Sequence, residues 1–366
     1  MQYTNRLWEP CVTHEAEYAI KFIDNFFKNN RNVLFICGAG FDPRAIILSQ
    51  HISAYIRDIR LNAIIFREER PHPNAALTEK ADLNSQGLES LLKNVKFIHL
   101  EVLSRDDGAV VGGRKTVEVI SKLPFSDYTD IVIDISALSI GVIFPMIRYI
   151  FSLLRQRKLM INLHIFVTNS PAIDMNISSI FCEKADYLHG FDAGIQLNSA
   201  QEAKKLWMPQ LSLPKHSALV RIFSKVKPDE TCPIMPWPSD NPKLPDKLLE
   251  EYRSELLSDW EVDQRDIVFA SESDPLDLYR TILDLDDFRH KVLDGLGGSF
   301  LILSPTGSKL MALGSLLAAL NRNLPVAYLE TMEYTFHEAT AQAAITNDPN
   351  FYHLWVCGSE AYPTTS

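Results

Sequence analysis

A glycine turn between an apolar segment and an expected helix is the first place where this chain is expected to do chemistry. The apolar residues Val33 to Cys37 lead into Gly38-Ala39-Gly40, and an acidic and a basic residue follow. A strand, a glycine turn and a helix in this order bring backbone amides and a helix N-terminus close to a ligand, usually an anionic one. The residues expected to contact that ligand are Gly38, Gly40, Asp42 and Arg44.

The same turn also has a purely structural interpretation. The dinucleotide-binding fingerprint needs a third glycine three positions after the second, and Pro43 stands there. Asp42 suits the N-cap of a helix whose first residue is Pro43. Arg44 is unfavourable beside the positive N-terminus of a helix unless an anion or a carboxylate balances it. The turn is therefore predicted either to bind a ligand or to act as a tight turn with a helix cap.

The segment Ser304-Pro-Thr-Gly-Ser-Lys309 is the second place where chemistry is expected. It follows the apolar residues Phe300–Leu303 and precedes an expected helix over Leu310–Leu320. Hydroxyls, a glycine and a lysine at one helix N-terminus favour binding of a phosphate or a carboxylate. The alternative is a helix cap with the lysine in solvent. The residues expected to bind a ligand are Ser304, Thr306, Gly307, Ser308 and Lys309.

Polar residues after other expected strands extend the candidate set. Asp134 and Ser136 follow one strand, and they either contact a ribose, act as an acid–base pair or cap the next helix. Ser271 opens the segment Ser271-Glu-Ser-Asp274 before Pro275, which either caps a helix or places Ser271 near the Thr306 loop. Asn169 follows the strand expected over Ile161–Val167.

The segment from Phe300 to Leu329 resembles the nucleotide-sensing Rossmann domains called CARF and their SAVED relatives. The resemblance is carried by Thr306, Gly307, Ser308 and Lys309, which open a helix after a strand. It implies that this loop contacts a cyclic oligonucleotide or similar nucleotide. It also implies a role in bacterial antiviral defence.

A second resemblance is to sirtuin-type NAD-consuming domains. It is carried by Gly38-Ala39-Gly40, by Asn169 and Asp174, and by Leu188-His189-Gly190. This resemblance implies an enzyme in which His189 and Asn169 are catalytic. Asp134 is a further catalytic candidate, as a member of the acid–base pair. The sequence does not decide whether the chain is an enzyme, and it names no cofactor.

These residues are expected to be positioned by an α/β fold with Rossmann-like parallel sheets flanked by helices in two lobes. Apolar runs without alternation predict strands that are covered on both faces, which is typical of parallel sheets. The strands expected in the first half are Val33–Cys37, Leu61–Phe66, Val95–Val102, Ile131–Ile135 and Ile161–Val167. The helices expected there are Glu15–Lys28, Arg44–Ile59, Asn84–Lys93, Lys115–Leu123 and Ile143–Arg157.

The second half alternates strand and helix in the same way, so an internal duplication is one interpretation. We predict domains over residues 1–200 and 215–366, with linkers or loops at 200–215 and at the proline-rich residues 231–245. The expected elements are strand Ala218–Phe223, helix Lys243–Trp260, strand Ile267–Ala270, helix Asp274–Leu293, strand Ser299–Leu303, helix Ser308–Asn321, strand Val326–Leu329 and the apolar run Tyr352–Cys357.

Composition limits the remaining possibilities. The chain has 366 residues, of which 46% are hydrophobic, and a formal net charge of −10. The acidic balance disfavours broad nucleic-acid binding. Five scattered cysteines without metal spacing predict a cytoplasmic protein with reduced thiols and no metal site. No membrane span or signal peptide is expected.

Three hypotheses follow for the function. The first is a sensor or regulator that binds a nucleotide-like anion at strand-end loops. The second is an enzyme that consumes NAD or another nucleotide. The third is a structural subunit, whose partner is another copy of the chain or a larger complex.

Overall fold

The chain folds into two compact units. The computed structural model describes residues 5–27, 31–55, 60–192, 203–337 and 350–362. The first unit contains residues 8–176 and 332–366, and the second unit contains residues 1–7 and 177–331. β7 (Ile177–Phe181) and β15 (Thr331–Phe336) lie at two of the points where the chain passes from one unit to the other.

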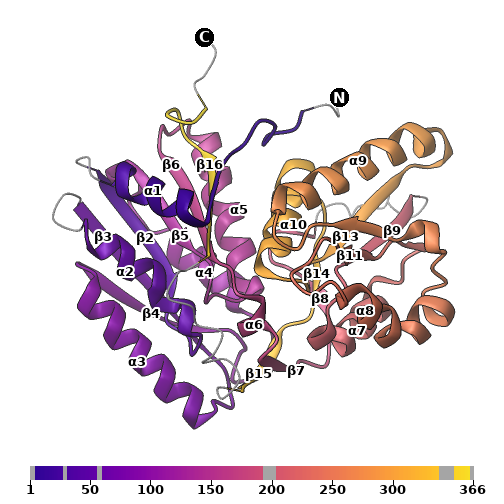
Figure 1. Ribbon diagram of the computed structural model, residues 1–366, viewed down its shortest axis with the longest axis horizontal. Helices are drawn as coiled ribbons and strands as arrows, with labels where there is room; N and C mark the ends of the chain where they lie inside the picture. The colour runs from indigo at the N-terminus through magenta and orange to yellow at the C-terminus, as the bar shows by residue number, and fades with distance from the viewer. Residues whose placement is uncertain (1–4, 28–30, 56–59, 193–202, 338–349, 363–366) are drawn as a thin grey trace. The chain divides into compact units, whose positions relative to one another are not determined.

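The first unit is built on a seven-stranded sheet with the order β1-β16-β6-β5-β2-β3-β4. The five strands from β6 to β4 are parallel, β16 is antiparallel to β6, and β1 is antiparallel to β16. In Figure 1 the yellow strand β16 lies beside β6, far from it in sequence. The strands are β1 (Val12–Glu15), β2 (Asn32–Gly38), β3 (Arg60–Glu69), β4 (Val95–Glu101), β5 (Asp130–Asp134), β6 (Asn162–Thr168) and β16 (Phe351–Cys357).

Helices cover both faces of this sheet, with α2 and α3 on one face and α4 and α5 on the other (Figure 1). Continuous apolar strands such as β2 and β5 are stable at the centre of the sheet because helices keep water from both of their faces. The helices are α1 (Ala16–Phe26), η1 (Pro43–Ile46), α2 (Ile47–Ser53), α3 (Ala75–Leu91), α4 (Gly112–Ile120), η2 (Phe125–Asp127), α5 (Ile140–Gln156) and α6 (Pro171–Asp174).

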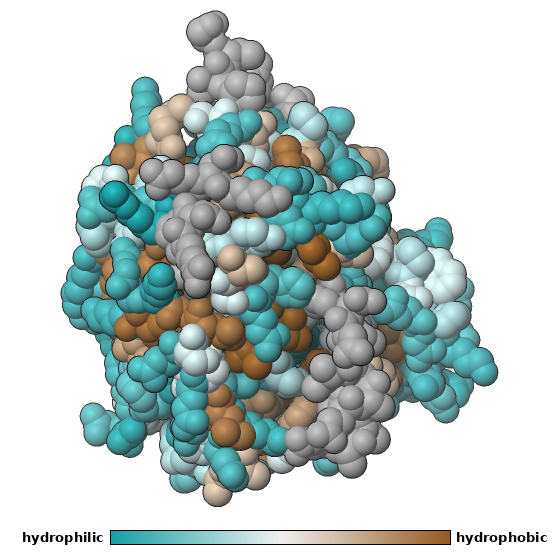
Figure 2. Space-filling view, turned by 60° about the vertical axis from the view of Figure 1, so that its left-hand side comes forward, coloured by the Kyte–Doolittle hydropathy of each residue, from teal (hydrophilic) through white to brown (hydrophobic). Residues whose placement is uncertain are grey.

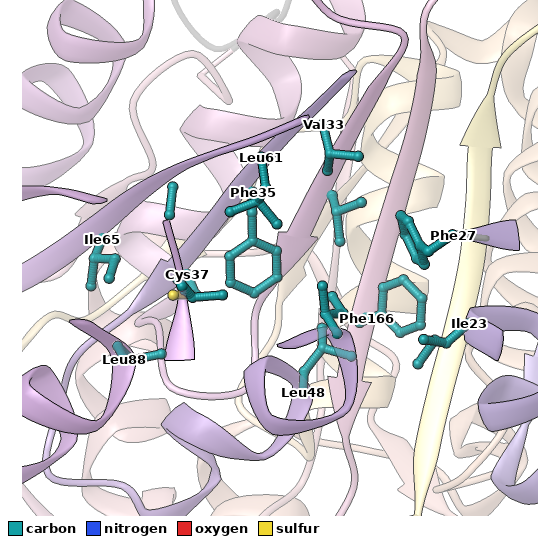
Figure 3. Close-up of a cluster of buried hydrophobic side chains, with 14 of the residues drawn as sticks. Ile23, Phe27, Val33, Phe35, Cys37, Leu48, Leu61, Ile65, Leu88 and Phe166 are labelled. Carbon is teal, nitrogen blue, oxygen red and sulfur yellow. The ribbon is translucent and has the colours of Figure 1, made fainter. Parts of the chain in front are cut away.

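The core between the sheet and α1, α2 and α3 is shown in Figure 3. Phe35 and Cys37 of β2 point into it and meet Leu48 of α2 and Leu88 of α3. All four side chains are fully buried or nearly so. Burial of each large apolar side chain contributes about 1.5–3 kcal/mol. This packing holds the end of β2, and therefore the glycine turn after it, in a fixed position.

The second unit has the same strand order as the first. β10, β9 and β13 form a parallel sheet, and β11 pairs in parallel with β12. Parallel bridges from Gln210 to Ile234 and from Leu303 to Val326 join these strands in the order β12-β11-β9-β13-β14. The strands are β8 (Asp186–Tyr187), β9 (Lys204–Pro209), β10 (Glu230–Thr231), β11 (Ile234–Pro236), β12 (Val268–Ala270), β13 (Ser299–Ser304) and β14 (Ala327–Tyr328).

Numbered along the chain, the five parallel strands of each unit lie in the order 3-2-1-4-5. In each unit an antiparallel strand lies beside the fifth strand in the sheet, β16 beside β6 and β8 beside β14. The helices of the second unit are η4 (Leu213–Lys215), α7 (His216–Val226), α8 (Leu244–Glu251), η5 (Glu255–Asp259), η6 (Gln264–Asp266), α9 (Pro275–Leu293), η7 (Asp294–Leu296) and α10 (Lys309–Arg322). The predicted α/β class with Rossmann-like sheets in two lobes is confirmed.

The structure corrects four local predictions. The expected linker at 200–215, of which residues 200–202 lie outside the described part, contains β9. The expected strand Ala218–Phe223 lies within α7, whose buried residues Ala218, Leu219, Ile222 and Val226 have helical spacing. The expected loop at 231–245 contains β11, which ends at a proline. The run at Tyr352–Cys357 forms β16 and belongs to the first unit, so the chain divides after residue 176.

In the face shown in Figure 2, brown apolar areas are interspersed with teal polar residues. Among the residues that the structure describes, no helix has both the length and the apolar character needed to cross a membrane.

Three histidines on neighbouring strands of the first unit form a hydrogen-bonded chain. His14 Nδ1 lies 2.9 Å from His353 Nδ1, and His353 Nε2 lies 3.0 Å from His164 Nδ1. His164 Nε2 is 3.6 Å from the buried carboxylate of Asp130, which also pairs with Arg31. Burial lowers the pKa of His164, and burial together with the two neighbouring histidines lowers that of His353 well below its usual value. Both rings are therefore neutral in the fold near pH 7.

We predict that the protein loses about 1–2 kcal/mol of stability between pH 8 and pH 6. Unfolded histidines have a pKa of about 6.5 and bind protons as pH falls through that value. Folded His164 and His353 stay neutral there because their pKa values are lowered, so the free energy of unfolding falls as pH falls. Urea unfolding across this range measures the slope. His353→Gln should reduce it, and His72→Gln, at an exposed histidine, should not. Asp134, whose pKa is raised, contributes an opposite pH dependence, and Asp134→Asn removes it. A stability profile that is flat both in the parent and in Asp134→Asn would contradict the prediction.

Candidate functional site

The switch point of the first unit lies where β2 and β5 end side by side. These two parallel strands are neighbours, yet α2 follows β2 on one face of the sheet and α5 follows β5 on the other. In sheets of this kind ligands bind beyond the carboxyl ends of the strands at the point where the order reverses. The candidates that the sequence places here are Gly38, Gly40, Asp42, Arg44, Asp134 and Ser136.

Gly38 is the position where the backbone permits no side chain. A Cβ atom there would lie 2.8 Å from Leu138 Cδ2 and 2.9 Å from the carbonyl oxygen of Ala137. At Gly40 a Cβ atom would lie 3.5 Å from that same oxygen, which is ordinary contact. The loop after β5 therefore packs directly on the end of β2, and only glycine at position 38 allows this approach.

Arg44 has its charge balanced within the protein. Its side chain is 2% exposed, and Nη2 donates to Asp42 Oδ2 and to Asp174 Oδ1, both at 2.7 Å. Burial opposes the charged form, but Asp174 and Asp42 outweigh it and raise the pKa of Arg44. Asp42 also caps η1 by accepting from the Arg44 amide at 2.9 Å. The sequence predicts that Arg44 offsets the charge of a ligand. In the structure, two carboxylates of the protein already balance the charge of Arg44.

Asp134 and Ser136 form a buried polar pair at the end of β5. Asp134 Oδ1 accepts hydrogen bonds from the amide and the hydroxyl of Ser136, and the Ser136 oxygen accepts from the amide of Thr168. Burial raises the pKa of Asp134 to about 6, and Asp42 adds to this rise while the Ser136 bonds oppose it. A carboxyl group that titrates near neutral pH is common at functional sites.

Several buried polar atoms in this region have no hydrogen-bond partner within the described residues. They belong to residues at the ends of β2, β5 and β6 or in the segments just after them. A buried polar atom without a partner costs about 1–3 kcal/mol, and such atoms are rare in folded proteins. The atoms are Arg44 Nη1, Asp134 Oδ2, Ser139 Oγ, Thr168 Oγ1 and Asp174 Oδ2.

Glu68 is a member of the site that the sequence analysis missed. It lies near the end of β3, and its carboxylate accepts from the Ser139 amide at 2.7 Å and pairs with Arg70 at 3.1 Å. Arg70 in turn lies over the ring of Tyr334, which packs against Phe41 of the glycine turn. The available signal was an acidic residue at the end of the second parallel strand, a position that often contacts a ribose in dinucleotide-binding folds.

The loop at the N-terminus of α10 in the second unit is filled by Gln210. Gln210 Oε1 accepts from the Gly307 amide at 2.9 Å, and Nε2 donates to Met311 O and Ser315 Oγ. Thr306 donates its hydroxyl to the Gln210 carbonyl, and Ser308 caps the helix through the Met311 amide. An anion bound at the Gly307 amide would have to displace the Gln210 carboxamide.

The remaining candidates are placed as follows. Ser304 is buried and donates to the Ala327 carbonyl, and Lys309 is the first residue of α10. Ser271 accepts from the Asp274 amide just before α9, which matches its interpretation as part of a cap. His189 is exposed and belongs to the second unit, whereas Asn169 belongs to the first. Neither unit alone therefore contains the pair that the resemblance to NAD-consuming domains implies.

No protein-family model and no curated protein matches this chain. Among solved structures, it is similar to a deacetylase of the teicoplanin biosynthesis pathway, with 10% identity and a TM-score of 0.27 over 43% of this chain and 76% of that one. A universal stress protein from Archaeoglobus fulgidus matches with 9% identity and a TM-score of 0.23, over 83% and 97% of the two chains. A U34-tRNA thiolase from Methanococcus maripaludis matches with 12% identity and a TM-score of 0.24, over 39% and 51%. These scores are too low to carry an argument about function.

We expect Gly38→Ala to destabilise the first unit by about 1–3 kcal/mol, because the added methyl group meets backbone as well as side-chain atoms. Gly40→Ala is the matched control and should change the free energy of unfolding by less than about 0.5 kcal/mol. Denaturant midpoints of the two variants measure the difference. Equal midpoints would show that the β5 loop does not pack on Gly38 as described.

We expect Gln210→Ala to cost about 2–4 kcal/mol, since it opens a cavity and leaves the Gly307 amide and the Met311 carbonyl without their partner. Gln264→Ala removes an exposed glutamine and should stay within about 0.5 kcal/mol of the parent. Urea unfolding measures both. A Gln210→Ala variant as stable as the control would mean that the carboxamide does not fill the loop.

Proposed function

We propose that this chain binds a nucleotide-like ligand at the switch point of the first unit and acts as a sensor or regulator. The observation that carries the proposal is the group of partnerless buried polar atoms around the ends of β2, β5 and β6. A ligand that hydrogen-bonds to these atoms removes the free-energy cost of leaving them buried without partners. Asp134, which titrates near neutral pH, and the close approach at Gly38 add support.

The first unit is favoured over the second as the place of binding. Both units present a loop between the fourth parallel strand and its helix, but in the second unit the Gly307 amide already donates to Gln210. The two ligand-binding groups predicted from the sequence are therefore not equivalent. Binding at Thr306 to Lys309 requires a rearrangement that binding at Asp134 does not.

The sensor role and the link to bacterial antiviral defence are inferred from the resemblance of Phe300 to Leu329 to CARF and SAVED domains. β13, the hydroxyl-rich loop and α10 follow the strand, loop and helix order of that resemblance, but the ligand is placed in the first unit because Gln210 fills this loop. Under this proposal the nucleotide is a signal, and its binding rather than its conversion is the functional event.

The proposal is tested by calorimetric titration with a panel of nucleotides and cyclic oligonucleotides at pH 7.5. We expect at least one of them to bind, and Asp134→Asn to weaken it by about tenfold or more, because the amide cannot replace a charged acceptor. Lys309→Ala serves as the matched variant in the second unit and should bind as the parent does.

Two results would contradict this proposal. If no nucleotide in the panel binds the parent, the function is wrong. If Lys309→Ala abolishes binding while Asp134→Asn retains it, the ligand binds at the α10 loop and the assignment to the first unit is wrong. Urea midpoints of both variants exclude loss of folding as the cause.

A further inference from the structure

Among the described residues, the two arginines at the switch point are each paired with carboxylates. Arg44 is paired with Asp42 and Asp174, and Arg70 is paired with Glu68. Asp134 adds a carboxyl group for which no basic partner is within ion-pair distance among the described residues. These residues together are acidic at neutral pH, and carboxylates repel a phosphate group placed beside them.

The partnerless atoms define the hydrogen bonds that a ligand must offer. Asp134 Oδ2 and Asp174 Oδ2 are acceptors and need donors, whereas Arg44 Nη1 is a donor and needs an acceptor. A hydroxyl group both donates and accepts, but an ionised phosphate only accepts. Two neighbouring hydroxyls on one ligand can therefore donate to the carboxylates while one of their oxygens accepts from Arg44.

Half-buried aromatic side chains adjoin this polar group. Phe41 follows the glycine turn directly, and its ring centroid lies 5.5 Å from that of Tyr334. Aromatic side chains stack on nucleobases, with about 1–3 kcal/mol per base in known complexes. Arg70, which pairs with Glu68, lies over the Tyr334 ring, so the aromatic pair adjoins the polar group through this ion pair and offers a surface on which the base of a ligand can stack.

We propose that the group bound at the switch point is the 2′,3′-diol of a ribose, held by Asp134, Asp174 and Arg44, with the phosphates of the ligand outside this group of residues. This inference rests on the proposed function and restricts its ligands to nucleotides with a free 2′,3′-diol, which excludes 3′,5′-linked cyclic oligonucleotides from this site. It reverses the expectation that phosphate is the group recognised at the glycine turn.

The inference has a pH dependence that follows from Asp134. Its pKa of about 6 means that the carboxylate form, which accepts from a hydroxyl, prevails above that pH. Asp42 and Arg44 are the charged groups that act on it most directly, and Asp174 and Glu68 stand in the same region. Affinity for a diol should therefore fall as pH falls through 6.

The experiment compares ribonucleoside 5′-monophosphates with their 2′-deoxy and 3′-deoxy counterparts by calorimetry at pH 7.5. We expect each deoxy compound to bind at least about tenfold more weakly, because it leaves a buried carboxylate oxygen unpaired. Inorganic phosphate and pyrophosphate should neither bind nor compete. In Asp134→Asn the penalty for the missing hydroxyl should shrink, and in Asp106→Asn, an exposed control, it should persist.

The outcomes separate this inference from the proposed function. If ribonucleotides and deoxynucleotides bind equally well, or if phosphate alone competes, the diol assignment is overturned while nucleotide binding stands. If free glucose binds as tightly as the ribonucleotides, the site takes sugar hydroxyls in general and the assignment to ribose is wrong. If none of the nucleotides binds, the proposed function itself fails.

Discussion

Burial of the parallel strands on both faces is the constraint on which the rest of this structure depends. Every side chain from Val33 to Cys37 on β2 and from Asp130 to Asp134 on β5 is buried beneath helices. Polar groups along such strands have no water and few partners, so they gather where the strands end. On β5 the two carboxylates stand at its two ends, Asp130 beside Arg31 and Asp134 beside Ser136. The first is neutralised by a salt bridge, and the second is left with an unsatisfied oxygen.

The two units show how one strand order can support two different strand-end loops. In the first unit the strand leading to the switch point ends in Gly38, and the loop from the neighbouring strand packs against its backbone. In the second unit the equivalent strand is followed by Gln210, whose carboxamide fills the corresponding loop. A single side chain at this strand end therefore distinguishes a loop with its polar groups satisfied from one with its polar groups unsatisfied.

Much of the architecture could be predicted from sequence, because buried parallel strands and amphipathic helices leave local patterns. Such patterns predicted the strands over Val33–Cys37 and Ile131–Ile135 and the helix over Asp274–Leu293 close to their observed bounds. β9 was missed because its six residues include two lysines and end at a proline, a weak local pattern that only its two parallel neighbours stabilise. The domain division was missed because no local pattern says which sheet a strand joins, and β16 joins the sheet of the first unit.

The candidate site was predicted in part. The residue types at strand ends were sufficient to select Asp42, Arg44, Asp134 and Ser136, but not to predict which of them pair with each other. Asp174 lies 130 positions from its partner Arg44, and Glu68 lies 71 positions from Ser139, whose amide donates to it. Such contacts leave no local trace in the sequence. The way Gln210 fills the α10 loop could not be predicted either, because its carboxamide hydrogen-bonds to a helix about a hundred residues later in the chain.

The place of β16 in the sheet also has a consequence for how the protein is made. β1 pairs with β16 alone among the described strands, and β16 lies between β1 and β6. On the ribosome, residues 12–15 emerge more than three hundred residues before their partner does. Once β6 has been synthesised, its edge stays uncovered until β16 follows, and all the strands from β7 to β14 are synthesised in between. The unit whose strands are synthesised first is thus completed last, and during translation its nascent sheet has an open edge that is able to pair with other chains.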